Sequence, residues 1–342
     1  MIRTVGIVSL SRGLLGEPFM QHEAALGLSR LQAYGLRVKF LPHARDGLDA
    51  LRRHPEWRAE DLLQAFRDPE IDLILCAIGG DDTYRLAPYL FEHGELQKAV
   101  RQKPFLGFSD TTIDHFMLHK VGLPTFYGKA FLPDICELDK EMLPYTRQYF
   151  EELLTSGCIC CIRPSGVWYE SRKSYDASQL GTPLRAHEEA GGFRLLQGGG
   201  QFRGEILGGC IDSIFDMFDP TRYADMPEIC RRYGLFPSAA EWQGKILLLE
   251  TSEEQMEPAK FRRALEYLKQ AGVFAAVSGV LVGKPMDGVW QAEYEALLPQ
   301  VIGDPELPVV CGLSVGHALP RCIVPFGVMA QVDVPAQKIE FL

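Results

Sequence analysis

Apolar runs of strand length alternate with stretches of helical periodicity through the first 150 residues of the chain. The clearest run is 71–78 (IDLILCAI), whose nearly continuous apolar character is typical of a strand covered on both faces. Shorter apolar runs predict three more strands, at 4–10, 37–41 and 104–108. Helical patterns lie between and after them, at 20–34, 59–67, 85–93 and 112–120. This alternation predicts an α/β fold with a parallel sheet between two layers of helices.

The pattern changes in the second half of the chain. Residues 165–190 are polar and aromatic with poor periodicity, which predicts a long surface loop or hairpin. Strand-like runs and glycine pairs then predominate, and alternating residues at 323–342 predict strands that close this second part. We therefore divide the chain into an N-terminal α/β domain, a linker with a substrate loop, and a β-rich C-terminal domain, at 1–150, 151–195 and 196–342.

Composition excludes several classes of function. The 342 residues are 46% hydrophobic and 23% charged, as in an ordinary globular protein. The net charge of −10 argues against nucleic acid as a partner, since a phosphate backbone needs clustered Lys and Arg. No apolar run is long enough to span a membrane, and residues 1–10 lack the pattern of a secretion signal. We therefore expect a cytoplasmic protein without a membrane partner.

Nine cysteines are spread along the chain, several of them inside apolar runs. Buried thiols in a reducing compartment are the simplest explanation. Cys158, Cys160 and Cys161 form a cluster, but no second set of ligands lies nearby in the sequence to complete a zinc site. We therefore expect no structural metal.

Ser109 stands where the predicted strand at 104–108 gives way to the predicted helix at 112–120. Such a turn points the side chain out of the sheet, beside the unpaired N–H groups and positive end of a helix. Nucleophilic serines of other folds occupy similar turns. In those folds glycine stands two residues after the serine, whereas in this chain Thr111 stands there. Serine is also favoured at a helix start simply as a cap, and this segment alone leaves both explanations open.

Glu250 and His317 also end or follow apolar strand-like runs. A serine nucleophile needs a base within hydrogen-bond reach and a third group that orients the base. Histidine has a suitable pKa, and a carboxylate is the usual orienting group. Alone, Glu250 could be a solvated strand end and His317 a structural histidine. Together with Ser109 at a third strand end, they become candidates for one catalytic site.

The segment 79–83 (GGDDT) follows the buried strand at 71–78. Glycines in this position free backbone N–H groups to face an anion. The anion could be the oxyanion of a serine hydrolase, or a phosphate, because the segment resembles the Gly-Gly-Asp-Gly-Thr signature of NAD kinases. Asp82 stands at the third glycine of that signature, and the chain has no Walker-type motif. A simple tight turn is the third explanation.

These segments belong to a longer ordered series of motifs. The series is 79–83 (GGDDT), 107–110 (GFSD), 125–128 (TFYG), 204–210 (GEILGGC), 249–254 (LETSEE), 279–285 (GVLVGKP), 316–317 (GH) and 325–327 (PFG). In this order the chain resembles the LD-carboxypeptidase family of serine peptidases over nearly its whole length. It is most similar to the branch of that family that contains microcin C immunity proteins.

The resemblance implies a serine peptidase with a Ser109–Glu250–His317 triad and no metal or organic cofactor. It implies an oxyanion hole, which we place at the N–H groups of Asp110 and of Gly80 or Asp81. It also implies an N-terminal domain with a flavodoxin-like parallel sheet and flanking helices. A C-terminal mixed domain with a barrel-like sheet supplies the acid and base, and a homodimer is expected.

Two substrate classes follow from the resemblance. The family trims the terminal D-amino acid of murein tetrapeptides, or cleaves small peptidyl- or aminoacyl-nucleotides of the microcin C type. Trp168 and Tyr169 lie where the immunity branch carries nucleobase-stacking aromatics, so Trp168 either stacks on adenine or packs the loop onto the body. The chain departs from the family at Lys129 and Lys284, where proline and arginine are frequent.

Two other classes of function stay open at this point. The GGDDT segment could serve a nucleotide or NAD kinase, which would require ATP and Mg²⁺. Alternatively, the chain could keep the peptidase fold only to bind a peptide or nucleotide without cleaving it.

Overall fold

The computed structural model describes residues 2–342, and its first sheet has the strand order β14-β5-β4-β3-β1-β2. The strands are β1 (Thr4–Val8), β2 (Arg37–Phe40), β3 (Leu73–Cys76), β4 (Phe105–Gly107), β5 (Thr125–Tyr127) and β14 (Val324–Phe326). β1 to β5 run parallel in the order 2-1-3-4-5. That order is the flavodoxin-like one, so the predicted fold of the first part is confirmed.

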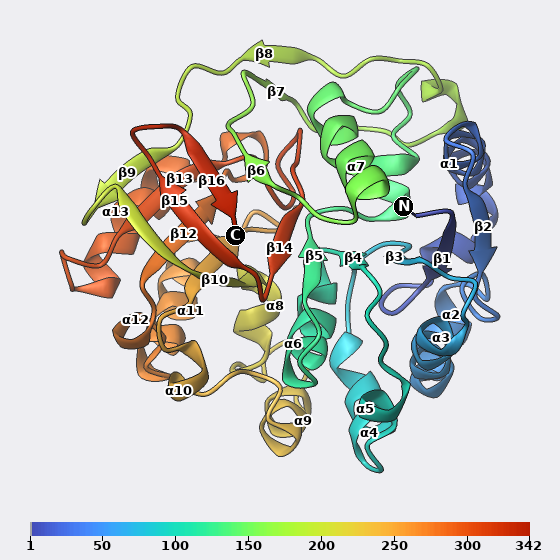
Figure 1. Cartoon of the computed structure of the whole chain (residues 1–342), viewed down its shortest axis with the longest axis horizontal. Helices are drawn as coiled ribbons and strands as arrows, with labels where there is room; N and C mark the ends of the chain where they lie inside the picture. Colours follow the sequence, from blue (N-terminus) through green and yellow to red (C-terminus); the bar gives the residue numbers. More distant parts are fainter. Residues whose placement is uncertain (1) are drawn as a thin grey trace.

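Helices cover both faces of this sheet (Figure 1). They are α1 (Gln21–Ala33), α2 (Leu48–Arg53), α3 (Pro55–Arg67), α4 (Ala87–Phe91), α5 (Glu95–Ala99), α6 (Thr112–Lys120) and α7 (Pro144–Ser156). β3 is buried along its whole length, as its uninterrupted apolar run predicts. The loops that leave the carboxyl ends of β1, β3 and β4 therefore meet at one edge of the sheet, where ligands gather in such folds.

The second sheet is mixed, with the order β6-β16-β15-β10-β11-β12-β13-β9. Its strands are β6 (Cys161–Ile162), β9 (Arg194–Gln197), β10 (Gln201–Cys210), β11 (Ile246–Glu250), β12 (Gly279–Gly283), β13 (Val309–Leu313), β15 (Met329–Asp333) and β16 (Lys338–Phe341). β10 to β13 are parallel and the remaining pairings are antiparallel. β6 and β9 form its two edges.

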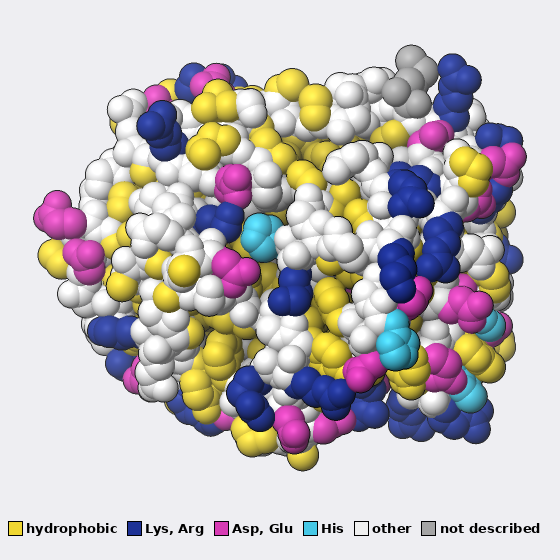
Figure 2. Space-filling model, turned by 60° about the horizontal axis from the view of Figure 1, so that its bottom comes forward, with side chains coloured by type: hydrophobic (Ala, Val, Ile, Leu, Met, Phe, Trp, Pro, Cys, Tyr) yellow, Lys and Arg dark blue, Asp and Glu magenta, His cyan; other side chains and the backbone are white. Residues whose placement is uncertain are grey.

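The helices of the second half are α8 (Ile211–Asp216), α9 (Met226–Tyr233), α10 (Ala239–Trp242), α11 (Pro258–Gln270), α12 (Val273–Ala276) and α13 (Gln291–Ile302). Among residues 2–342, no helix combines the length and apolar character needed to cross a membrane. Acidic and basic side chains are interspersed over the face shown in Figure 2.

The predicted loop or hairpin at 165–190 contains a two-stranded sheet of β7 (Val167–Tyr169) and β8 (Ala186–Glu188). The expectation that the last residues close the second part is confirmed for β15 and β16, which lie in the second sheet, but is wrong for β14. β14 does not close the second sheet but pairs antiparallel with β5 of the first, with Val324 opposite Tyr127. The edge of the first sheet therefore consists of a segment from the C-terminal part of the chain. The domain boundaries at 150 and 195 stay a prediction.

Candidate active site

Ser109 occupies a strained turn between β4 and α6. Its φ of +66° lies in the left-handed region, which residues other than glycine seldom adopt. The neighbouring loop comes very close, since a Cβ on Gly79 would lie 2.5 Å from Ser109 Cβ and 2.8 Å from its Oγ. The turn thus needs glycine at position 79 and holds the serine hydroxyl in a fixed place.

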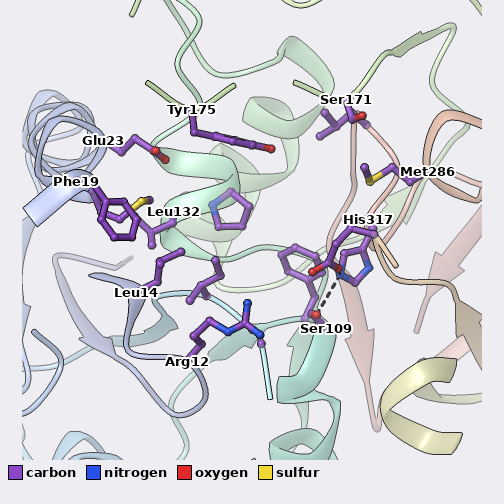
Figure 3. Close-up of a pocket in the computed structure, with 18 of the residues that line it drawn as sticks. Arg12, Leu14, Phe19, Glu23, Ser109, Leu132, Ser171, Tyr175, Met286 and His317 are labelled. Carbon is purple, nitrogen blue, oxygen red and sulfur yellow. Dashed lines mark hydrogen bonds and ion pairs between the residues drawn. The ribbon is translucent and has the colours of Figure 1, made fainter. Parts of the chain in front are cut away.

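The structure brings Glu250 and His317 to this hydroxyl. Glu250 is the last residue of β11, and His317 lies on the turn after β13. His317 Nε2 is 3.0 Å from Ser109 Oγ (Figure 3), and Nδ1 is 2.8 Å from Glu250 Oε2. The backbone N–H of His317 also donates to Glu250 Oε2, at 3.1 Å. The carboxylate therefore fixes both the ring and the loop that carries it.

Tyr127, at the end of β5, connects the two ends of this chain of contacts. Its hydroxyl donates to Glu250 Oε1 at 2.6 Å and accepts the backbone N–H of Ser109 at 3.2 Å. The side chain is fully buried. Tyr127 was assigned no role in the sequence analysis. Its position could have pointed to one, because Tyr127 is the last residue of β5, just as Glu250 is the last residue of β11.

A second carboxylate reaches the other side of the imidazole. Glu253 Oε2 lies 3.0 Å from His317 Nε2, and its side chain is 57% exposed. Burial of His317 favours the neutral ring, but the Glu250 and Glu253 carboxylates outweigh it and raise the pKa of His317 to about 10. The hydrogen bond to His317 in turn lowers the pKa of Glu253 to about 2, despite partial burial. This arrangement favours the charged imidazole, and Nε2 is shared between Ser109 and Glu253.

The expected oxyanion donors lie beside Ser109 but differ in availability. The N–H of Asp81 donates to Ser11 Oγ at 2.7 Å, so this candidate is already engaged. Among residues 2–342 the N–H of Gly80 has no hydrogen-bond partner. The N–H of Asp110 belongs to the first turn of a helical segment, where N–H groups lack intrahelical acceptors. Gly80 and Asp110 are therefore the better pair of donors.

The side chains of Asp82 and Thr83, in the GGDDT segment, bind protein rather than facing open space. The Asp82 carboxylate accepts from the buried Arg58 guanidinium at 2.6 Å. The N–H and hydroxyl of Thr83 both donate to the Asp110 carboxylate. These contacts tie the loop to the segment that carries Ser109 and disfavour its use as a phosphate loop.

One cluster with metal-binding side chains includes two residues of this site. Among residues 2–342, a ligand atom each from Cys210, Glu250 and His317 lie within 4.8 Å of one another. Burial and the nearby Glu250 carboxylate raise the pKa of the Cys210 thiol, which disfavours the thiolate that a metal would need. Glu250 and the ring nitrogens of His317 are already hydrogen-bonded. The geometry suits proton transfer better than metal binding.

A cavity of about 840 Å³ opens in front of Ser109 and His317 (Figure 3). Apolar side chains form much of its lining, and they include Leu14, Phe19, Leu132 and Met286. Tyr175 covers it from the segment between β7 and β8. Charged side chains also line the cavity: Arg12 lies near the serine and Glu23 on the side away from it, and the others are Asp176, Glu253 and Arg321.

Trp168 and Tyr169 are not part of this lining. The Trp168 ring stacks on His187 of the paired strand, with centroids 4.3 Å apart and planes inclined by 14°. The backbone N–H of Tyr169 donates to Leu319 O at 3.0 Å, two residues after His317. The β7–β8 hairpin thus packs against the loop that carries His317. Tyr175, which lies between β7 and β8, lines the cavity, although the sequence analysis did not single it out.

The two lysines that depart from the family lie away from the cavity. Lys129 is fully buried and donates to Arg321 O, and burial lowers the pKa of Lys129 to about 8. Lys284 forms an ion pair with Glu189 at 2.9 Å. Lys129 therefore supports the segment that follows His317.

Comparison with known proteins places the chain among peptidases. Residues 5–128 match the LD-carboxypeptidase N-terminal domain, and residues 203–332 match the LD-carboxypeptidase C-terminal domain. Microcin C7 self-immunity protein MccF of Escherichia coli is 27% identical over 290 residues, covering 82% of this chain and 77% of that protein. The probable murein peptide carboxypeptidase of Bacillus subtilis is 27% identical over 311 residues, covering 89% and 82%.

Solved structures of MccF and of an MccF-like protein share the fold of this chain. An MccF-like protein from Streptococcus pneumoniae, in complex with AMP, has a TM-score of 0.98 and 57% identity, covering 100% of this chain and 99% of that one. MccF in complex with aspartyl sulfamoyl adenosine has a TM-score of 0.79 and 23% identity, covering 99% and 95%, which shows a shared fold. With both family domains matched and more than half of its residues identical to an MccF-like protein, this chain belongs to the LD-carboxypeptidase family.

Proposed function

We propose that this protein is a serine carboxypeptidase or amidase with Ser109 as nucleophile, His317 as general base and Glu250 as the orienting acid. The observation that carries the proposal is the continuous chain of contacts from Ser109 Oγ through the imidazole to Glu250, at 3.0 and 2.8 Å. Such a chain is what a weakly nucleophilic hydroxyl needs for activation.

In the proposed reaction, Glu253 first moves away from Nε2, and the imidazolium of His317 gives its Nε2 proton to water. Neutral His317 then takes the proton of Ser109 Oγ while that oxygen attacks the amide carbonyl carbon. The N–H groups of Gly80 and Asp110 stabilise the oxyanion. His317 returns the proton to the leaving nitrogen, the C–N bond breaks, and water hydrolyses the acyl-enzyme by the reverse sequence.

For the substrate, we propose a peptidyl- or aminoacyl-nucleotide of the microcin C type, which would make the protein a detoxifying or immunity enzyme. The S. pneumoniae relative with 57% identity is described in complex with AMP. The cavity beside Ser109 is large, mainly apolar and lined by Phe19 and Tyr175, which suits a planar base. A murein tetrapeptide is the second candidate, because the B. subtilis relative is a probable murein peptide carboxypeptidase.

Product analysis by mass spectrometry separates these substrates. Purified protein is incubated with an aminoacyl-sulfamoyl adenosine and with a murein tetrapeptide, and Ser109→Ala is the matched variant. We expect the wild type to release the free amino acid from the first substrate faster than a D-amino acid from the second. Turnover retained in Ser109→Ala would contradict the role of Ser109. Phosphorylation of a nucleotide with ATP and Mg²⁺, without hydrolysis of either substrate, would favour a kinase.

Two further expectations from the family resemblance belong to this proposal. We propose a homodimer, which sedimentation analysis of the purified chain tests. We also propose a cytoplasmic location, where a peptidase would meet peptidyl-nucleotides that have entered the cell. Fractionation of the source cells tests this location.

A further inference from the structure

Glu23 presents an unpartnered carboxyl group to the cavity. The residue lies on α1, is 3% exposed and lines the cavity, and Figure 3 shows its carboxyl turned inward on the side away from Ser109. Among residues 2–342, neither carboxyl oxygen accepts a hydrogen bond, and Oε1 is completely enclosed. The nearest cationic candidate is His22, whose Nε2 lies 3.9 Å from Oε1 and is 2.9 Å from Tyr175 O. A buried carboxyl without a partner is unusual in a folded protein.

The charges around Glu23 do not balance. The buried Arg172 guanidinium is already paired with Glu137 and donates to Thr182 O at 2.9 Å. Arg172 thus pairs with Glu137 and not with Glu23. Asp176 adds another carboxyl to the cavity lining, in which Arg12 and Arg321 are the basic side chains besides the histidines. Burial first and the Glu137 charge second raise the pKa of Glu23 to about 7, with Arg172 acting in the opposite direction. Within residues 2–342, His22 at 3.9 Å is the one basic side chain within ion-pair distance of Glu23, and none donates a hydrogen bond to it.

We propose that Glu23 is a specificity subsite that binds a nitrogen donor, an amino or ammonium group, at the end of the substrate remote from the cleaved bond. This inference rests on the proposed function of Ser109. An N–H donor in the cavity would satisfy Oε2, the carboxyl oxygen that, within the described part of the chain, is neither enclosed nor hydrogen-bonded. An anionic group beside Glu23 would be repelled by Glu23 and Asp176, and an apolar group would leave the carboxyl unpaired.

The donor could come from a nucleobase or from a peptide side chain, and two matched substrate pairs distinguish these sources. One pair is an aminoacyl-sulfamoyl adenosine and its analogue with hydrogen in place of the 6-amino group. The other is a murein-type tetrapeptide with lysine and the same peptide with Nε-acetyl-lysine. The pair that contains the true donor should show at least about tenfold preference for the amine-bearing member, through KM, which is the scale of one hydrogen bond to a charged group.

Glu23→Met, which removes the acceptor, should abolish that preference. Glu23→Gln keeps an acceptor without charge, so it should retain part of the preference for a neutral amino group and lose the preference for an ammonium. Glu60→Gln, an exposed carboxyl on α3, is the matched control. Circular dichroism and thermal unfolding establish that the variants are folded.

Binding of the same pairs to the Ser109→Ala variant, measured by calorimetry, separates this inference from the proposed function. If the wild type hydrolyses a substrate but Glu23→Met leaves both preferences unchanged, the subsite inference is wrong and the peptidase proposal stands. If the wild type hydrolyses none of the four compounds, the peptidase proposal fails. In that case calorimetry still tests the subsite. A binding preference for the amine-bearing compound that is lost in Glu23→Met supports it, and the absence of any preference contradicts it.

Discussion

Glu253 Oε2 lies 3.0 Å from Nε2 of His317, the same ring nitrogen that faces Ser109 Oγ. A carboxylate in this place stabilises the imidazolium, whereas a general base must be neutral when the hydroxyl attacks. The contact therefore opposes the proposed first step until substrate or a change of the Thr251–Met256 segment removes it. It also links the activity to pH, since the raised pKa of His317 is partly due to Glu253.

Replacing Glu253 by Gln should move the acidic limb of the pH–rate profile to lower pH. The substitution removes one of the charges that raise the pKa of His317, so the neutral ring becomes populated at a lower pH. Steady-state kcat/KM measured across pH tests this. Glu254→Gln is the control, because Glu254 pairs with Arg222 at 3.4 Å and not with the imidazole. An unchanged or higher midpoint for Glu253→Gln would contradict the prediction.

Tyr127→Phe should lower both stability and turnover. The hydroxyl is a donor to buried Glu250 and an acceptor for the N–H of Ser109, so its loss leaves a buried carboxylate oxygen unpaired. The expected cost is about 1–3 kcal/mol in the free energy of unfolding. We expect kcat to fall about tenfold, equivalent to roughly 1.4 kcal/mol in the activation barrier. Denaturant titration and steady-state kinetics measure the two effects, and wild-type values in both would show that Tyr127 is dispensable.

Gly79→Ala should abolish activity. The new Cβ would lie 2.5 Å from Ser109 Cβ and 2.8 Å from its Oγ, so the serine has to leave its position. Overpacking of this kind costs typically about 1–3 kcal/mol, which the fold should survive. Gly166→Ala is the matched control, because a Cβ there meets no atom within 4 Å. Thermal unfolding together with turnover tests this, and an active Gly79→Ala enzyme would refute the close approach of the two loops.

Tyr175→Ala should raise KM more than Trp168→Ala. Tyr175 lines the cavity, whereas Trp168 stacks on His187 within its own hairpin. Loss of a base–aromatic stack costs about 1–3 kcal/mol, or up to about a hundredfold in affinity. Binding of AMP and of an aminoacyl-sulfamoyl adenosine to the two variants provides the comparison. A larger effect of Trp168→Ala would restore the stacking role that the sequence suggested for Trp168.

The sequence predicts what depends on local pattern. The run at 71–78 contains β3 because a strand buried on both faces must be apolar throughout, and the helix at 112–120 has the bounds of α6. Ser109, Glu250 and His317 can be proposed together because each stands at or just after the end of a strand-like run. Their roles in catalysis stay a prediction.

What the sequence does not predict depends on contacts between distant segments. β14 joins β5 through a pairing that no local periodicity encodes, and its three buried apolar residues would fit either sheet. Asp81 seemed equal to Gly80 as a donor until the structure placed Ser11 Oγ against its N–H. Glu23 has no sequence signal at all, because a glutamate on an amphipathic helix is ordinarily solvated, and only the packing around α1 encloses it.

The pairing of β14 with β5 determines when, during synthesis, the residues of the candidate active site can come together. Ser109 and His317 stand 208 positions apart, and the strand that completes the first sheet follows the histidine. On the ribosome, the N-terminal part is made long before these partners leave the exit tunnel. Nascent chains therefore cannot bring the hydroxyl and the imidazole together, and the proposed hydrolysis must await synthesis and folding of the residues up to β14.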